Sequence, residues 1–176
     1  MIKIVHGDLF EQQVDTIVCP VNTVGVMGKG LAKAFKQKYR GLDAVYRLML
    51  GSDRLSVDKV CKVRVAPADY RRHAMSILLF ATKKDWKNPS EMKWIRSGLR
   101  HFAEYYKDKV ITSVAFPLIG CGLGGLDEKK VIKLIKKELG HLLIDVIIVL
   151  PELKDGEKPS PFVTKDTGNG KKKKKK

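Results

Sequence analysis

The sequence lacks a hydrophobic run of membrane-spanning length, and it has few cysteines. No apolar stretch approaches the roughly 20 residues that a transmembrane helix needs, and the N-terminus shows no charged segment followed by an apolar one. These absences predict a cytoplasmic protein with no membrane partner. The three cysteines, Cys19, Cys61 and Cys121, are odd in number and follow no ligand spacing. The sequence therefore favours neither a disulfide framework nor a zinc site.

Histidines in metal-binding or catalytic patterns are also missing. The four histidines are scattered, and no two of them have metal-ligand spacing on one expected element. No Ser-His-Asp or Cys-His pattern is visible either. We therefore predict no metal site and no cofactor.

Acidic residues are scarce relative to basic ones. The chain has 35 lysines and arginines against 19 aspartates and glutamates, which gives a net charge of +16. The lysine run at residues 171–176 supplies six of these charges, so the rest of the chain still carries +10. A basic surface attracts polyanions such as nucleic acid, although solubility alone is the other explanation. The lysine run is of low complexity and repels itself, so we expect it to be disordered, whether native or appended.

Two glycine-rich turns are the strongest motifs in the chain. Residues 116–125 form an apolar strand that enters a loop with four glycines in six residues, and residues 25–30 contain three glycines. Backbone without Cβ atoms lets amide groups approach a ligand closely, and a helix that begins behind such a loop favours negative charge. Two such turns indicate a ligand with two phosphates, although tight turns needed only for packing are the alternative. Neither turn matches a dinucleotide or P-loop fingerprint.

Alternating apolar strands and helical stripes predict an α/β fold. We expect strands at 2–5, 15–20, 60–65, 75–80, 110–117 and 144–150, and helices after Gly30, at 42–50, from Pro89-Ser90 to Tyr106 and at 131–139. The strands at 60–65 and 75–80 should be adjacent and joined by a charged turn at 69–72. We therefore expect a three-layer α/β/α sandwich with a mixed, mostly parallel central sheet.

The domain organisation follows from the same pattern. Residues 1–151 should form one domain, and residues 152–176 should be a polar, disordered basic tail, because no apolar stripe follows Glu152. In parallel sheets of this kind, ligands bind outside the carboxyl ends of the strands, which is where both glycine turns fall.

Three sequence blocks carry a resemblance to a known family. They are His-Gly-Asp-Leu at residues 6–9, the glycine-containing string at 20–32, and the glycine loop at 118–126. In this order and spacing they resemble the macrodomains, a family of α/β/α modules that bind ADP-ribose. The resemblance covers residues 1–150, and it implies that ADP-ribose or an ADP-ribosylated molecule is the binding partner.

One branch of that family looks most similar. The string at 21–32, the Thr82-Lys83 pair and Trp86 resemble antitoxin macrodomains that remove ADP-ribose from thymidine in DNA, together with terminal ADP-ribose protein glycohydrolases. In that branch the lysine after the threonine is catalytic, and it maps onto Lys83. The chain departs from the antitoxins at Ala81, where proline is common. It departs from the protein glycohydrolases at Gly124, where they carry an acidic residue.

The resemblance also implies the binding residues. Asp8 would accept a hydrogen bond from the adenine amino group, and Asn22 would contact the hydroxyls of the ribose farthest from adenine. Further implications are a paired ADP-ribosyltransferase toxin and a monomeric state. The full set of implied ADP-ribose contacts is Asp8, Leu9, Asn22, Thr23, Gly28, Lys29, Gly30, Gly120, Cys121, Gly122, Leu123, Gly124 and Gly125.

Lys83 has two possible chemical roles. A lysine attacks carbon only as the neutral amine, whereas an ordinary lysine is almost entirely protonated at pH 7. Attack on the anomeric carbon would therefore require burial or a neighbouring cation, for which Lys84 is a candidate. Lys83 could instead donate a proton to the departing base. From the residues alone, the Lys83-Lys84 pair is typical of a solvated basic loop.

The resemblance favours removal of ADP-ribose from a nucleobase as the function, with thymidine in single-stranded DNA as the expected acceptor. Trp86, Lys87, Trp94 and Arg96 could form a stacking rim for that strand, or the tryptophans could simply pack in the core. Alternative substrates are ADP-ribosylated acidic protein side chains and ADP-ribose 1″-phosphate. A further alternative is a module that binds ADP-ribose or a related nucleotide without catalysis.

Overall fold

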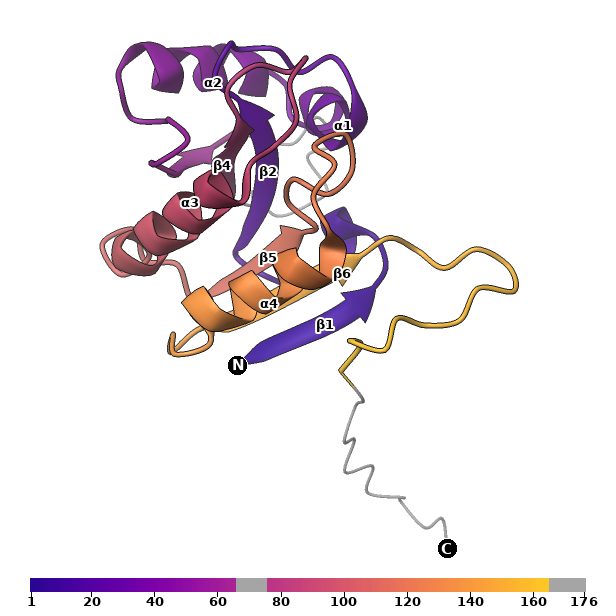
Figure 1. The fold of residues 1–176 in the computed structure, drawn as a ribbon. Helices are drawn as coiled ribbons and strands as arrows, with labels where there is room; N and C mark the ends of the chain where they lie inside the picture. Colours follow the sequence, from indigo (N-terminus) through magenta and orange to yellow (C-terminus); the bar gives the residue numbers. More distant parts are fainter. Residues whose placement is uncertain (66–75, 165–176) are drawn as a thin grey trace, which may run out of the picture.

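The structure, a computed structural model, describes residues 1–65 and 76–164 of the 176-residue chain (Figure 1). The charged turn expected at 69–72 and the lysine run at 171–176 lie outside the described residues.

The described residues form one six-stranded sheet. The strand order is β1-β6-β5-β2-β4-β3, and every neighbouring pair is parallel except β3 and β4, which are antiparallel. The expected mixed, mostly parallel sheet is therefore confirmed. The strands are β1 (Ile2–His6), β2 (Thr16–Asn22), β3 (Cys61–Arg64), β4 (Ser76–Lys83), β5 (Ser113–Pro117) and β6 (Asp145–Leu150).

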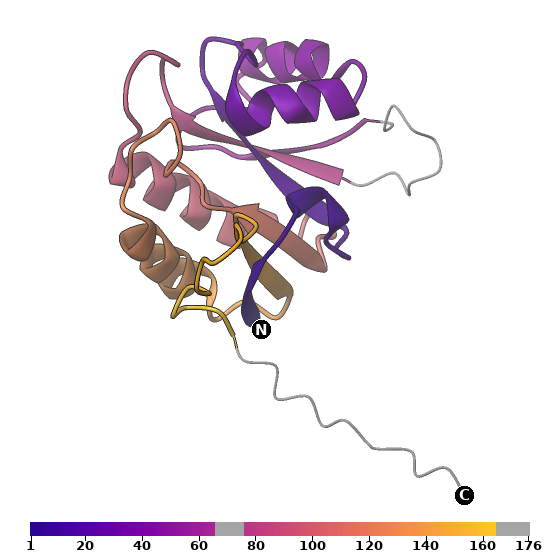
Figure 2. The same cartoon turned by 90° about the vertical axis from the view of Figure 1, so that its right-hand side faces the viewer.

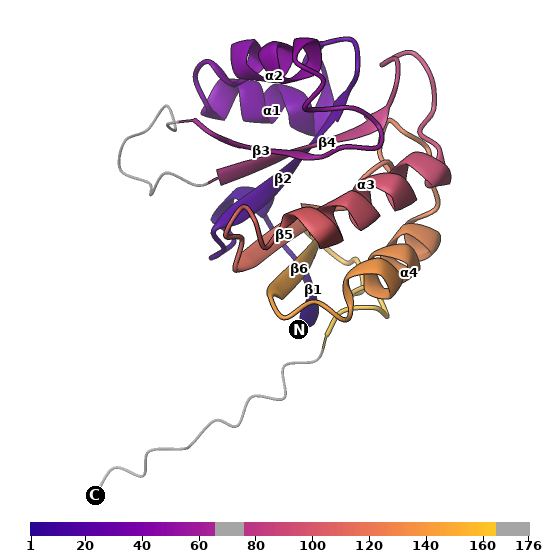
Figure 3. The same cartoon turned by 90° about the vertical axis from the view of Figure 1, so that its left-hand side faces the viewer.

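Two helices cover each face of the sheet, which confirms the three layers (Figures 1 and 3). One hydrophobic cluster joins the sheet to α1 (Gly30–Lys38) and α2 (Leu42–Gly51), and the other joins it to α3 (Met92–Tyr105) and α4 (Glu128–Leu139). Alternate side chains of a strand point to opposite faces, so successive β4 residues enter different clusters. Buried Phe80, for example, packs under α3, whereas Ala81 belongs to the α1 and α2 side.

Strand β4 extends farther than its sequence pattern indicates. The sequence predicted an end at Phe80, but the strand continues to Lys83, and all eight of its residues are buried. Lys83 is thus the buried end of a strand inside the sheet, whereas Lys84, the other lysine of the expected basic loop, is exposed.

The segment after β6 differs from the expected detached tail. Residues 152–164 form neither helix nor strand, and their trace returns along the folded domain (Figure 2). Phe162 and Val163 pack against the core. The Ile4 amide donates to Thr164 Oγ1 over 2.8 Å, and the Thr164 amide donates to the Ile4 carbonyl over 3.0 Å. The polar composition of residues 152–164 gave no signal for this contact, because the apolar side chains that make it are Phe162 and Val163. The folded unit therefore extends to at least Thr164, beyond the expected boundary at 151.

Candidate functional site

A cavity of 690 Å³ opens at the carboxyl ends of the parallel strands. Its lining includes Asp8 after β1, Pro151 after β6, the glycine loop after β5, the turn after β2, and Lys83 at the end of β4. The volume is within the usual range for small-molecule sites. Because four inter-strand steps of about 4.8 Å separate β1 from β4, the cavity extends roughly 19 Å across the sheet. An elongated ligand suits this shape better than a compact one.

Asp8 lies at the β1 end of the cavity. One carboxylate oxygen accepts the Phe10 amide over 2.8 Å and caps the short 3-10 helix at Leu9–Glu11. The carboxylate is exposed, and its second oxygen has no partner among the described residues. Asp8 therefore has one fixed oxygen and one available to accept a hydrogen bond from a ligand amine.

The loop after β5 supplies unpaired backbone donors in the middle of the cavity. Among the described residues, the amides of Gly122, Leu123 and Gly124 donate to no protein acceptor, and all three residues line the cavity. Gly120 has a φ of +76°, a conformation that disfavours any side chain. A Cβ atom at Gly124 would overlap the Gly120 carbonyl oxygen and Ser90 Oγ. The glycines thus allow a tightly folded loop whose free amides suit an anion.

Helices α1 and α4 both begin at the cavity, but only the N-terminus of α1 lacks a side-chain cap. The side chain of Asp127 accepts the Lys130 amide over 2.9 Å and caps α4. This cap pairs one amide of the first α4 turn and places a carboxylate there, so it leaves less room for a phosphate at this helix; that α4 helps to bind phosphate stays a prediction. Helix α1 has no side-chain cap and no acidic residue in its first turn, and its first residues, Gly30, Leu31 and Ala32, line the cavity. Its unpaired amides favour an anion.

Asn22 organises the turn between β2 and α1. Its side-chain oxygen accepts the Val24 and Val26 amides over 3.0 and 3.3 Å, and its side-chain nitrogen donates to the Val26 carbonyl over 2.8 Å. The Tyr46 hydroxyl also donates to this side-chain oxygen over 2.8 Å. Burial raises the pKa of Tyr46 to about 12, so the hydroxyl keeps its proton. Asn22 lines the cavity, but only one of its amide hydrogens is left for a ligand.

Thr23 does not line the cavity, and neither does Gly125. The Thr23 amide and hydroxyl both donate to the Lys84 carbonyl, over 2.9 and 3.0 Å. Thr23 therefore ties the turn after β2 to the end of β4 instead of reaching a ligand. The other predicted contacts, Asp8, Leu9, Asn22, Gly28, Lys29, Gly30, Gly120, Cys121, Gly122, Leu123 and Gly124, all lie in the lining.

Lys83 is buried at the β4 end of the cavity. Only 8% of its surface is exposed, and its Nζ donates to the Leu123 carbonyl of the glycine loop over 3.0 Å. The β2–β4 register shifts at this point, so that Val21 pairs with Ala81 and Asn22 pairs with Lys83. Thr82 is thus a bulge residue, and a bulge redirects the side chains beside it. Among the described residues, no carboxylate lies within ion-pair distance of Lys83.

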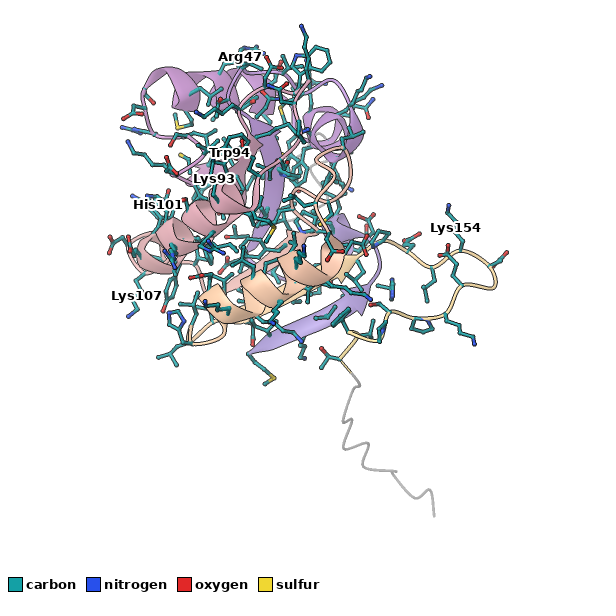
Figure 4. All side chains as sticks on the ribbon, viewed as in Figure 1. Arg47, Lys93, Trp94, His101, Lys107 and Lys154 are labelled. Atoms are coloured by element: carbon teal, nitrogen blue, oxygen red, sulfur yellow. The ribbon has the colours of Figure 1, made fainter. Side chains whose placement is uncertain are left out.

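The Lys84 side chain lies outside the cavity that Lys83 lines. It is exposed, does not line the cavity, and has its Nζ 6.0 Å from the ring centroid of Trp94. Lys93 lies over the same ring at 5.4 Å (Figure 4). Trp94 itself is buried in the core. The expected rim is therefore only partly formed, because Trp94 packs and Arg96 lies outside the lining.

The mouth of the cavity near Lys83 is apolar. Trp86 is 47% exposed, Leu123 is 70% exposed and Val26 is 40% exposed, and all three line the cavity. Lys87 Nζ lies 5.4 Å from the Trp86 ring centroid, and the Lys87 amide donates to an Asp85 side-chain oxygen over 2.9 Å. The turn that carries Trp86 is thus hydrogen-bonded in place. These side chains form an apolar collar at the end of the cavity where Lys83 lies.

Cys121 is not an activated thiol. Burial, with the nearby charges of Glu128 and Asp127, raises the pKa of Cys121 to about 12. The thiol therefore stays protonated at neutral pH, and nucleophilic attack by this residue is disfavoured. In the part of the chain that the structure describes, no three His, Cys, Asp or Glu residues are placed to hold a metal ion, and none of the helices has the length and apolarity to cross a bilayer.

The chain is similar to proteins of known family. A family model described as Macro domain matches residues 18–135. A DNA ADP-ribosyl transferase–DNA ADP-ribosyl glycohydrolase fusion protein of Thermosipho africanus is 40% identical over 162 residues, which cover 85% of this chain and 42% of the relative. The chain spans only 35–42% of the length of this protein and of the DNA ADP-ribosyl glycohydrolases that it also matches.

Solved structures with the same fold include members of this group. The Thermosipho africanus DarTG structure in complex with ADP-ribose has a TM-score of 0.79 at 40% identity and covers 85% of this chain and 41% of that one. The macrodomain of Mycobacterium tuberculosis DarG has a TM-score of 0.77 at 33% identity and covers 85% of this chain and 97% of that one.

Proposed function

The chain belongs to the macrodomain family, and from this membership and the geometry of the cavity we propose that it is a glycohydrolase that removes ADP-ribose from a nucleobase of DNA. The observation that carries this proposal is the buried Lys83 amine at one end of a roughly 19 Å cavity whose middle is lined by unpaired backbone amides. In this arrangement the adenine lies at Asp8, the diphosphate at the glycine loop and the α1 N-terminus, and the distal ribose beside Lys83.

Lys83 acts on the bond between the ribose C1″ atom and a nitrogen of the base. As a neutral amine, Nζ forms a bond to C1″ while the C1″–N bond breaks and the base leaves with a proton. Water then replaces Nζ at C1″. As an ammonium, Lys83 instead gives its proton to the departing base while water attacks C1″. Both routes consume one water and release ADP-ribose and an unmodified base.

The apolar collar favours a nucleobase over a charged leaving group. Trp86, Leu123 and Val26 offer apolar surface at the mouth, where a carboxylate or a phosphate would lose hydration without gaining partners. Thymine presents a planar ring and a methyl group, which such surface accommodates, so thymidine in single-stranded DNA is the proposed acceptor. Position 124 is a glycine, and an added Cβ atom would overlap the Gly120 carbonyl oxygen, so the proposal uses no acidic side chain at this position.

The proposed biological partner is an ADP-ribosyltransferase that modifies the same DNA. The basis is the name of the Thermosipho africanus relative, which combines a DNA ADP-ribosyl transferase with a DNA ADP-ribosyl glycohydrolase in one protein. An enzyme that removes the modification would counteract such a transferase.

The deciding experiment measures release of ADP-ribose from ADP-ribosylated single-stranded DNA and from ADP-ribosylated protein in parallel. The wild type should act on the DNA. Lys83→Ala, and Lys83→Met, which keeps most of the buried side-chain volume, should each lower turnover by about 10² or more. Their affinity for free ADP-ribose, measured by calorimetry, should change only a few-fold, because neither variant removes a backbone amide.

Lys84→Ala is the matched control, because it removes an adjacent lysine whose side chain does not line the cavity. It should keep near-wild-type turnover. Wild-type turnover in both Lys83 variants would contradict the lysine mechanism. Release from protein alone would favour an acidic side-chain acceptor, and release from neither substrate would leave a non-catalytic ADP-ribose-binding module.

A further inference from the structure

A second pocket, which shares no lining residue with the proposed ADP-ribose cavity, lies between β3, the C-terminal half of α3 and the connection from α2 to β3. It encloses 780 Å³ and is lined by five cations and one carboxylate, Asp108. We call it the β3 groove. Its cations are Arg54, Lys59, Lys62, Arg64 and Lys109.

The cations of the β3 groove are mostly uncompensated. Lys59 pairs with Asp53 over 2.7 Å, but among the described residues no carboxylate lies within ion-pair distance of the other four. Lys62 Nζ donates to the Lys109 carbonyl over 2.9 Å, so it is held inside the groove. Burial lowers the pKa of Lys62, which Asp15 partly opposes and Arg64 reinforces. A cluster of this kind gains from a bound polyanion.

Two rings in the groove lining are fixed by the backbone of β3 and its flank. His101 and Tyr105 have ring centroids 5.3 Å apart and are tilted by 31°. The Val60 amide donates to His101 Nδ1 over 3.1 Å, and the Lys62 amide donates to the Tyr105 hydroxyl over 2.9 Å. Both rings are only partly buried. Aromatic rings surrounded by cations are the usual means by which proteins hold a single strand, because bases stack on the rings and phosphates pair with the cations.

Helix α3 connects the groove to the ADP-ribose cavity. Its N-terminal end lies at the cavity, where the Ser90 amide donates to the Gly124 carbonyl over 2.9 Å. His101 lies nine residues after Met92, which corresponds to about 14 Å along the helix (Figure 4). A strand bound at the groove is therefore within a few nucleotides of the collar.

We propose that the β3 groove binds the sugar-phosphate backbone of single-stranded DNA, with a base on the His101–Tyr105 pair. The groove would hold unmodified nucleotides of the strand whose modified base enters the ADP-ribose cavity. The identity of that strand rests on the proposed function, whereas binding of unmodified DNA does not.

The test is fluorescence anisotropy of the full chain with a labelled, unmodified oligothymidylate at several salt concentrations. The triple variant Arg54→Gln/Arg64→Gln/Lys109→Gln should lose at least tenfold in affinity. Its log–log salt slope should fall by about 2, because three phosphate contacts are lost. The control variant Lys133→Gln/Lys136→Gln/Lys137→Gln removes the same charge from exposed positions of α4. It should lose less than threefold.

Equal losses in the two triple variants would overturn the groove as a site and assign DNA binding to diffuse charge. No loss in either would overturn it too, and would assign binding to other segments. Binding of an oligoglutamate peptide with the same affinity and salt slope would overturn nucleic acid as the occupant. Affinity for free ADP-ribose should be unchanged in both variants. If the groove does not bind DNA, the wild type can still release ADP-ribose from DNA. The two experiments therefore distinguish failure of the groove proposal from failure of the proposed function.

Discussion

At the scale of single residues, backbone groups are the main feature of the cavity that suits the proposed diphosphate. Gly122 shows this most simply, because it lines the cavity, its amide is unpaired, and a Cβ atom built on it meets nothing within 4 Å. A side chain at this position would therefore enter the cavity without disturbing the fold.

Gly122→Glu should abolish detectable binding of ADP-ribose in calorimetry, because the carboxylate would occupy and repel the phosphate position. Its melting temperature should stay close to that of the wild type. Gly51→Glu is the control, since Gly51 at the end of α2 is equally open and does not line the cavity. Tight ADP-ribose binding by Gly122→Glu would mean that the phosphates lie elsewhere.

Trp86 should determine acceptor preference rather than ADP-ribose affinity. Trp86→Ala should raise the KM for ADP-ribosylated single-stranded DNA by about 5- to 150-fold, which corresponds to the 1–3 kcal/mol of one base–aromatic stack. Affinity for free ADP-ribose should change less than twofold. Trp86→Phe, which retains a ring, should recover most of the KM. An equal loss for DNA and for free ADP-ribose would place the ring against ADP-ribose itself.

At the scale of elements, one carboxylate joins the starts of β2 and β5. Asp15 accepts the Thr112 amide and hydroxyl over 2.7 and 2.6 Å, the Ser113 amide over 3.1 Å and the Thr16 hydroxyl over 2.7 Å. Burial by itself would raise the pKa of Asp15, but the hydrogen bonds from Thr112 and Thr16 outweigh it and hold the pKa below its usual value. The ionised form thus stabilises the folded state.

Asp15→Ala should lower the free energy of unfolding by about 1–2 kcal/mol at pH 7, because several donors lose their acceptor and solvent screens the partly exposed carboxylate. A pKa that is lowered in the folded state stabilises the protein above the unfolded pKa, near 3.8. That stabilisation is lost as the pH falls through the lower folded value. In urea titrations the difference between variant and wild type should therefore shrink below about pH 4.

Asp145→Ala is the control for this measurement. Asp145 also lies at a strand start, but it is exposed and its oxygen is 3.8 Å from the N-terminal amine. It should change stability by less than about 0.5 kcal/mol. A loss as large as that of Asp15→Ala would contradict the role given to the Asp15 hydrogen bonds.

At the scale of the whole molecule, the positive charge is spread well beyond the lysine run. A chain of residues 1–164 keeps every described residue, including the Thr164 contact with β1, and still carries +10. It should bind single-stranded DNA with an affinity that falls steeply with salt, measurable by anisotropy between about 50 and 200 mM salt. Loss of all measurable binding would assign DNA association to residues 165–176 alone.

The sequence by itself determined the α/β class, the alternation of strands and helices, and the strand ends at which the candidate site residues occur. These properties are local, because apolar period and glycine placement within a few residues decide them. The resemblance identified Asp8 and Lys83 as site residues, and the structure places both in one cavity. It also implied Thr23 and Gly125, which the structure leaves outside the lining.

Tertiary structure alone decided which groups are free to act. The burial of Lys83 depends on a bulge against β2 and on a carbonyl 40 residues away, and the Thr164 contact with Ile4 joins residues 160 apart. A local pattern cannot specify these outcomes, because each depends on a partner that only the folded chain brings within hydrogen-bonding distance.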